Sequence, residues 1–246
     1  MKHLRFCGLL FTAAVGLLLT SCSGGGSEKT TTTDSTAADT TVAAVKPPST
    51  IVTTPEFMGI VIHKVANYAK WLPAYESDDS LRLANGIHNY VIGRGLMDTN
   101  TVMVAVKITD TAKAFAFMKD SRLKAVMKKS GVTSVVSMSV ILAVWQDTAM
   151  LPPGTIRART TYTVKDWDVW LKNFEDGKQE RMDNGILSRV VSHDAMDNHK
   201  ISLVTAVTDT AKAFAYYKSD KLKARFVAGG ATTPPARWLF TIAKRY

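Results

Sequence analysis

Cysteine is nearly absent from this chain, and both of its occurrences lie near the start. Cys7 falls within an apolar run and Cys22 follows that run, so residues 23–246 contain no thiol. No disulfide, thiolate nucleophile or cysteine-based metal site can therefore form in that part of the chain. Its fold has to be stabilised by an apolar core, for which a hydrophobic content of 46% is sufficient.

The short motifs of common catalytic chemistries are missing as well. The sequence has no Gly-x-Ser-x-Gly, His-Glu-x-x-His or phosphate-binding loop, and Gly93-Arg94-Gly95 lacks the third glycine of a dinucleotide-binding turn. No run interleaves basic residues with stacking aromatics, so nucleic acid is not an expected partner. We expect no catalytic residue, no metal and no cofactor, and we favour a protein that is not an enzyme.

The N-terminus has the layout of a secretory signal. Lys2 and Arg5 precede an apolar run, Phe6–Leu19, that is shorter than the roughly 20 residues of a membrane-spanning helix. The tetrapeptide Leu19-Thr20-Ser21-Cys22 resembles the lipobox of bacterial lipoproteins. This resemblance implies a signal peptide over residues 1–21, lipidation of Cys22 and a lipid anchor in the bacterial cell envelope, at the outer membrane. An ordinary cleaved signal with a chance cysteine is the alternative.

Composition changes after Cys22. Residues 22–54 are rich in Ser, Thr, Gly and Ala and have too little apolar surface to offset the entropy of ordering, which predicts a disordered tether. The formal net charge of +10 belongs mainly to the remaining residues. Its lysines are concentrated in one late helix of each half, where they predict either contact with an anionic surface or a solvated helix face.

An octapeptide that occurs twice indicates the architecture of residues 55–246. Thr-Asp-Thr-Ala-Lys-Ala-Phe-Ala fills Thr109–Ala116 and again Thr208–Ala215, 99 positions later, and Trp-Leu and Asn-Gly-Ile pairs recur at the same offset. A period near 100 residues is too long for a solenoid, whose units have roughly 20–50 residues. We therefore predict two tandem domains, residues 55–150 and 151–246.

Each copy has the pattern of a β-α-β-β-α-β unit. Strand-like runs such as Gly59–Val65 precede a helix whose N-cap is Asn67 or Asp166, and Asn-Gly at residues 85–86 and 184–185 predicts the end of that helix. A hairpin, a helix capped by the octapeptide and a last strand follow. Pro73 predicts a kink in the first copy only. This order is ferredoxin-like, which makes the fold class α+β.

The segment His63–Trp71, together with Asp110–Ala116, is similar to the dimeric α+β barrel proteins, the superfamily that includes the antibiotic-biosynthesis-monooxygenase-like domains. In that superfamily two ferredoxin-like subunits place their sheets back to back. The resemblance implies that the two copies build one barrel within a single, monomeric chain. Its monooxygenases act without metal or flavin, and its haem-degrading members place the ligand between sheet and helices.

Candidate ligand-binding residues are polar side chains on the predicted strands. His63 lies on an apolar strand, where it either lines a cleft or is a hydrogen-bonded core residue. The other candidates share one strand parity and are predicted to form one pocket wall: His88, Tyr90, Arg94, Arg189 and His193. The segment His193–His199 has metal-ligating residue types, but its place at a hairpin tip favours turn formation.

Because polar residues differ between the copies at these positions, we expect one ligand for each chain, centred on the first copy with His63 and Arg94 as polar contacts. We interpret the protein as a lipid-anchored envelope module that binds a small ligand. A cofactor-free monooxygenase- or isomerase-like enzyme is the alternative, and a structural envelope protein is the third possibility.

Overall fold

The computed structural model describes residues 49–246. The predicted signal peptide, the lipidation at Cys22 and most of the predicted tether lie outside the described residues. The tether prediction is wrong at its end, because Ile51–Val52 form a short strand, β1, that pairs with Asp147 and Gln146 of β5. Two consecutive β-branched residues favour a strand where an edge is available to pair with.

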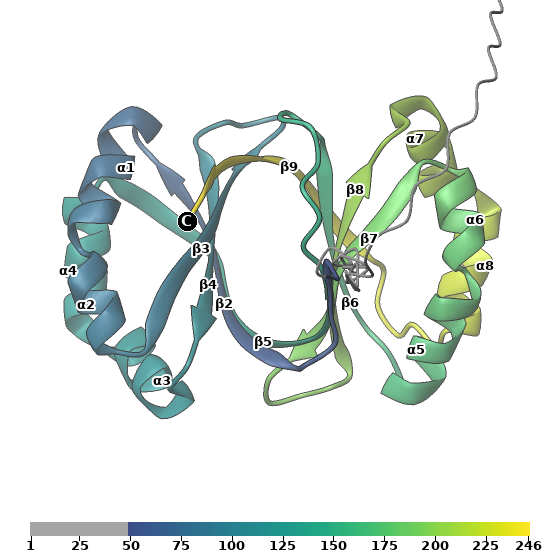
Figure 1. The fold of residues 1–246 in the computed structure, drawn as a ribbon, viewed down its shortest axis with the longest axis horizontal. Helices are drawn as coiled ribbons and strands as arrows, with labels where there is room; N and C mark the ends of the chain where they lie inside the picture. Colours follow the sequence, from purple (N-terminus) through teal and green to yellow (C-terminus); the bar gives the residue numbers. More distant parts are fainter. Residues whose placement is uncertain (1–48) are drawn as a thin grey trace, which may run out of the picture. The chain divides into compact units, whose positions relative to one another are not determined.

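Two β-α-β-β-α-β units follow each other in the chain (Figure 1). The elements of the first unit are β2 (Glu56–Val65), α1 (Tyr68–Ser77), α2 (Asp79–Ala84), β3 (Ile87–Gly95), β4 (Thr101–Ile108), α3 (Thr111–Lys119), α4 (Ser121–Lys129) and β5 (Val132–Asp147). Those of the second unit are β6 (Arg157–Thr163), α5 (Trp167–Asp176), α6 (Lys178–Asp183), β7 (Ile186–Asp194), β8 (Lys200–Val207), α7 (Thr210–Lys218), α8 (Asp220–Ala228) and β9 (Ala236–Arg245).

The strands of both units form one sheet that closes on itself. Its order is β1-β5-β2-β4-β3-β9-β6-β8-β7, every pairing is antiparallel, and a further β5–β7 pairing closes eight of the strands into a barrel. The helices cover the outside of the barrel, α1–α4 over the first unit and α5–α8 over the second (Figure 1). This arrangement confirms the predicted fold class.

Local signals place the helix ends where the sequence predicts them. The Asn67 side chain accepts a hydrogen bond from the Lys70 amide at 3.0 Å, and Asp110 does the same for the Lys113 amide. Gly86 and Gly185, which follow α2 and α6, both have a φ of 67°, and a Cβ on Gly185 would lie 2.5 Å from the Asp209 Cβ. Only glycine fits this left-handed turn against the next helix cap.

The kink expected from Pro73 does not distinguish the two units. Helix α1 runs through Pro73, and the helical segment breaks after it at Asp78. The second unit, which has Lys172 instead, breaks at the corresponding residue, Gly177. Because both units break at the same position, the break follows from the way the chain crosses the sheet, and Pro73 is not its cause.

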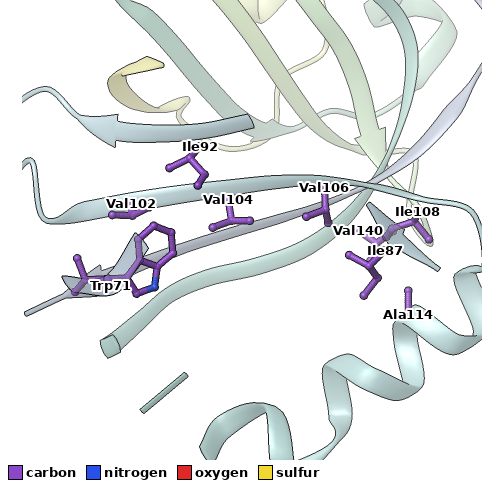
Figure 2. Packing of buried hydrophobic residues seen from close by; sticks show 10 residues of the cluster. Trp71, Ile87, Ile92, Val102, Val104, Val106, Ile108, Ala114 and Val140 are labelled. Atoms are coloured by element: carbon purple, nitrogen blue, oxygen red, sulfur yellow. The ribbon is translucent and has the colours of Figure 1, made fainter. Parts of the chain in front are cut away.

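The sheet has an apolar layer on each side. Side chains that face the helices pack around Trp71, Ile92 and Val104 in the first unit (Figure 2). Side chains that face the barrel interior pack around Met58 and Phe240. Because both faces of the strands are covered, a polar side chain on either face is buried and needs a partner.

Candidate functional site

A cavity of about 110 Å³ lies in the first unit between its sheet and its helices. Its walls come from β2 to β5 on one side and from α1 to α4 on the other, and they are mostly apolar. Lining side chains include His63, Trp71, Tyr75, Leu81, Met118 and Met127. His63 is the only imidazole among the lining residues.

His63 is buried in this cavity without a hydrogen-bond partner. Its side chain belongs to a residue that is 3% exposed, and neither ring nitrogen is bonded to any of the described residues. The Trp71 ring lies 5.3 Å away, centroid to centroid. Burial lowers the pKa of His63 to about 4, so the imidazole is neutral at pH 7 and carries one donor and one acceptor. His63 therefore lacks the partner that a hydrogen-bonded core histidine would have.

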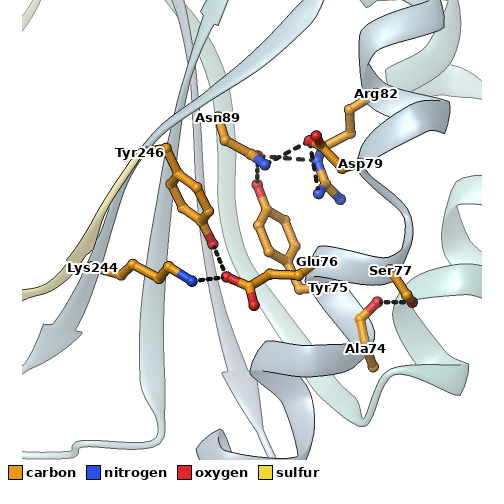
Figure 3. Close-up of polar contacts among 9 residues, drawn as sticks. All are labelled: Ala74, Tyr75, Glu76, Ser77, Asp79, Arg82, Asn89, Lys244 and Tyr246. Carbon is orange, nitrogen blue, oxygen red and sulfur yellow. Dashed lines mark hydrogen bonds and ion pairs between the residues drawn. The ribbon is translucent and has the colours of Figure 1, made fainter.

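A polar network holds α1 and α2 against β3 beside the cavity (Figure 3). The Tyr75 hydroxyl and the Arg82 Nε both donate to the Asn89 Oδ1, and the Asn89 amide donates to Asp79 at 2.6 Å. The Arg82 guanidinium also stacks 3.8 Å from the centre of the Tyr75 ring. Burial raises the pKa of Tyr75 to about 12, so its phenol stays protonated as a donor. The network fixes one wall of the cavity.

The corresponding space in the second unit is filled differently. Tyr162 occupies the position of His63, and its hydroxyl accepts a hydrogen bond of 2.6 Å from the Trp170 Nε1. Glu180 accepts further bonds from the Tyr216 hydroxyl at 2.8 Å and from Arg225 at 3.0 Å. The space that remains is about 70 Å³. The larger space, with an unpartnered imidazole, thus lies in the first unit, whereas the smaller space of the second unit is lined by Arg181, whose Nε also has no partner among the described residues.

The single pocket wall predicted from strand parity does not form. The register shifts between Asn89 and Val91 in β3, and between Ser188 and Val190 in β7. Each bulge reverses the alternation of side chains that follows it. Tyr90 and Arg189 consequently line the barrel interior.

The remaining candidates lie elsewhere. Arg94 stacks on Tyr68, 4.1 Å from its ring centre, and donates to the Thr99 carbonyl. It does not line the cavity, so the expected pairing of His63 with Arg94 is wrong. His193 packs against the Trp167 ring at 4.7 Å on the helix side of the sheet. His88 is exposed, 3.2 Å from the Thr109 hydroxyl.

Charged side chains inside the barrel are the site residues that the sequence did not reveal. Arg157 and Arg159 alternate with apolar residues in β6, and although arginine is rarely buried, Arg157 is 5% exposed and both line the barrel interior. Arg245 joins them from β9. The alternation in β6 indicates that both arginines lie on the same face of the strand. Whether that face is buried depends on whether the sheet closes into a barrel.

Within residues 49–246 no group of three or more His, Cys, Asp and Glu side chains has the arrangement of a metal site. At the β7–β8 hairpin tip, His199 is bonded to Asp197 at 3.0 Å. None of the helices in the same part of the chain is both long and apolar enough to span a membrane.

These features define a dimeric-type α+β barrel closed within one chain, and comparisons with solved structures agree. An anthrone oxidase-like protein matches with a TM-score of 0.55 and 11% identity, over 80% of this chain and 95% of its own. A candidate chlorite dismutase matches with 0.53 and 14%, over 78% and 96%. A candidate monooxygenase of Fusobacterium nucleatum matches with 0.50 and 11%, over 78% and 94%. At such identities the likeness establishes the fold alone.

Neither a protein-family model nor a curated protein sequence matches the chain.

Proposed function

We propose that the first unit binds one small, mainly apolar molecule that carries a hydrogen-bonding group, in the cavity beside His63. The observation that carries the proposal is the imidazole itself, which is buried and has no partner among the described residues. A buried polar group without a partner costs about 1–3 kcal/mol. A ligand hydroxyl or carbonyl in the cavity would complete its hydrogen bonding.

The size of the cavity limits the ligand. An engineered protein cavity of roughly 150 Å³ binds benzene, so a volume of about 110 Å³ suits a single ring or a short aliphatic chain. A haem does not fit this space, because pockets for ligands of drug size have roughly 300–1,000 Å³. We therefore derive no chemistry that involves haem. Phenol-like molecules, which combine one ring with one hydroxyl, match both the volume and the neutral imidazole.

The test is titration calorimetry of the full-length protein with phenol as the probe. We expect saturable binding of one phenol for each chain, and loss of at least tenfold in affinity in His63→Tyr, whose new side chain occupies part of the cavity as Tyr162 does in the second unit. His88→Tyr is the matched control, since it makes the same change at an exposed histidine of the same unit. Equal affinity in His63→Tyr and His88→Tyr would refute the proposal.

An oxygenase-like activity in the same cavity is the second candidate. The neutral imidazole of His63 can accept a proton from a phenolic O–H or an acidic C–H, and the similarity to an anthrone oxidase-like protein makes such substrates a reasonable choice. Oxygen consumption with hydroquinone, a single-ring phenol that suits the cavity volume, tests this activity when it is measured for the unaltered protein and for His63→Tyr. Consumption that is the same in both proteins would exclude His63 as the base.

We also propose that the protein is anchored in the bacterial envelope through lipid on Cys22, at the end of its lipobox-like tetrapeptide. In fractionated cells that produce Cys22→Ser, the protein should leave the membrane fraction. A wild-type protein whose mature N-terminus carries no lipid would contradict this anchor, whatever the outcome of the phenol titration.

A further inference from the structure

The interior of the barrel is apolar on one side and cationic on the other. The first unit contributes Met58, Ile60 and Met103 to it. The second unit contributes the guanidinium groups, which come from β6, β7 and β9: Arg157, Arg159, Arg189 and Arg245. A barrel of eight strands has an interior just wide enough to be filled by side chains or to hold one small ligand. Here a space of about 70 Å³ remains between the two sides.

The arginines have far more hydrogen-bond donors than partners. Arg157 donates one bond to the Thr155 carbonyl at 3.1 Å. Arg189 donates to Asp147 at 2.6 Å and to the Ala149 carbonyl. The Arg159 Nε is buried and bonded to none of the described residues. Because each guanidinium has five N–H donors, most of the donors at this site are left without a protein acceptor.

The charge is also uncompensated. Asp147 is the only carboxylate among the residues that line the space, and it is paired with Arg189. The nearby Glu56 is bonded to Gln146 and Lys107. Burial, together with the charges of Arg245 and Arg189, lowers the pKa of Arg157 to about 10, which leaves it protonated at pH 7. Like charges held close together in a buried space favour an anion between them.

The first unit shows that the fold does not require these charges. At the positions 99 residues earlier, Arg157 corresponds to Met58, Arg189 to Tyr90 and Arg245 to Gln146. All three counterparts are uncharged and sit in the same barrel. Burying unpaired charge is costly, so a purely structural role favours the residues of the first unit.

We propose that the barrel interior binds a small oxyanion, whose carboxylate or phosphate group lies between Arg157, Arg189 and Arg245. Guanidinium groups recognise both oxyanions through paired hydrogen bonds. Met58 and Phe240 on the facing wall limit the molecule to a short one, because the space between the two sides is only about 70 Å³. This site is separate from the cavity beside His63, which lies on the other face of the sheet.

The test is calorimetric titration of the full-length protein with four probes: inorganic phosphate, hexyl phosphate, acetate and hexanoate. We expect inorganic phosphate or acetate to bind at least tenfold more tightly than its hexyl counterpart, because a hexyl chain exceeds a space of about 70 Å³, and the tighter of the two short probes identifies the oxyanion. Binding should weaken as salt is raised. Equal affinity for the long and short probes would overturn binding inside the barrel, and no binding by any probe would overturn the site.

Arg157→Met, which introduces the residue of the first unit, should reduce the affinity at least tenfold. Lys124→Met is the matched control, because it removes one charge from an exposed helix position far from the barrel interior. The melting temperature of Arg157→Met should equal or exceed that of the unaltered protein, because the substitution removes a positive charge that Arg245 and Arg189 repel. An equal affinity in both variants would refute the assignment. Phenol binding beside His63 should be the same in both, which separates this test from that of the proposed function.

Discussion

The buried imidazole of His63 makes the stability of the fold depend on pH in a way that can be calculated. Its pKa falls from the ordinary value of 6.5 to about 4 because burial disfavours the charged form. Between these two values the unfolded chain takes up a proton at His63 and the folded chain does not. Protonation therefore favours the unfolded state, and the free energy of unfolding decreases as the pH falls from about 6.5 to about 4.

The magnitude follows from the size of the shift. Each unit of pKa difference corresponds to 1.36 kcal/mol, so the shift of His63 predicts a loss of about 3 kcal/mol once the pH is below both values. Above pH 7 the residue contributes no pH dependence. Such a loss is a large part of the roughly 5–15 kcal/mol that stabilises a typical domain.

The assay is urea unfolding at pH 7.5, 5.5 and 4, for the unaltered protein and for His63→Tyr. Carboxylates with lowered pKa, such as Glu56 and Glu180, also lose stabilising interactions as the pH falls, but they are common to both proteins and cancel in the difference. The difference in unfolding free energy should shift by about 3 kcal/mol in favour of His63→Tyr from pH 7.5 to pH 4. His88→Tyr should shift it far less. Parallel curves for all three proteins would refute the reasoning.

Three further predictions follow from the geometry. Tyr162→Phe leaves the buried Trp170 Nε1 without its acceptor and should lower the free energy of unfolding by about 1–3 kcal/mol in urea titrations. Gly185→Ala brings a Cβ within 2.5 Å of Asp209, so its loss of melting temperature should exceed that of Gly154→Ala, where φ is also positive but no atom lies within 4 Å. Because the barrel closes within one chain, light scattering should give a monomer, and a stable dimer would contradict this.

Much of the fold could be predicted because its signals are local. The repeated octapeptide contains the N-cap of α3 and of α7, and each Asn-Gly pair contains the glycine that ends the preceding helix. Each of these features depends on residues within one turn of one another. Their recurrence 99 positions later was enough to predict two units of the same kind and, from the strand order, a ferredoxin-like topology.

The candidate site was only partly predictable because strand faces depend on distant pairing. Tyr90 and Arg94 were expected on one wall, but the bulge in β3 arises from its register with β4 and separates them. Arg157 was not among the predicted site residues. It is buried because β3 pairs with β9 and β5 pairs with β7, which closes the sheet around it. Both pairings join strands of different units, so the sequence of a single unit does not predict them.

The difference between the two units supports a ligand-binding role for the cavity beside His63. At about 24 cal/mol per Å³, an empty space of about 110 Å³ costs on the order of 2–3 kcal/mol, to which the unpartnered imidazole adds. The second unit shows that the same backbone accepts a side chain that lowers both costs, because Tyr162 leaves a smaller space of about 70 Å³ and bonds to Trp170. A position that served packing alone would favour tyrosine in both units. The imidazole and the cavity of the first unit are therefore best explained by a molecule that occupies them together.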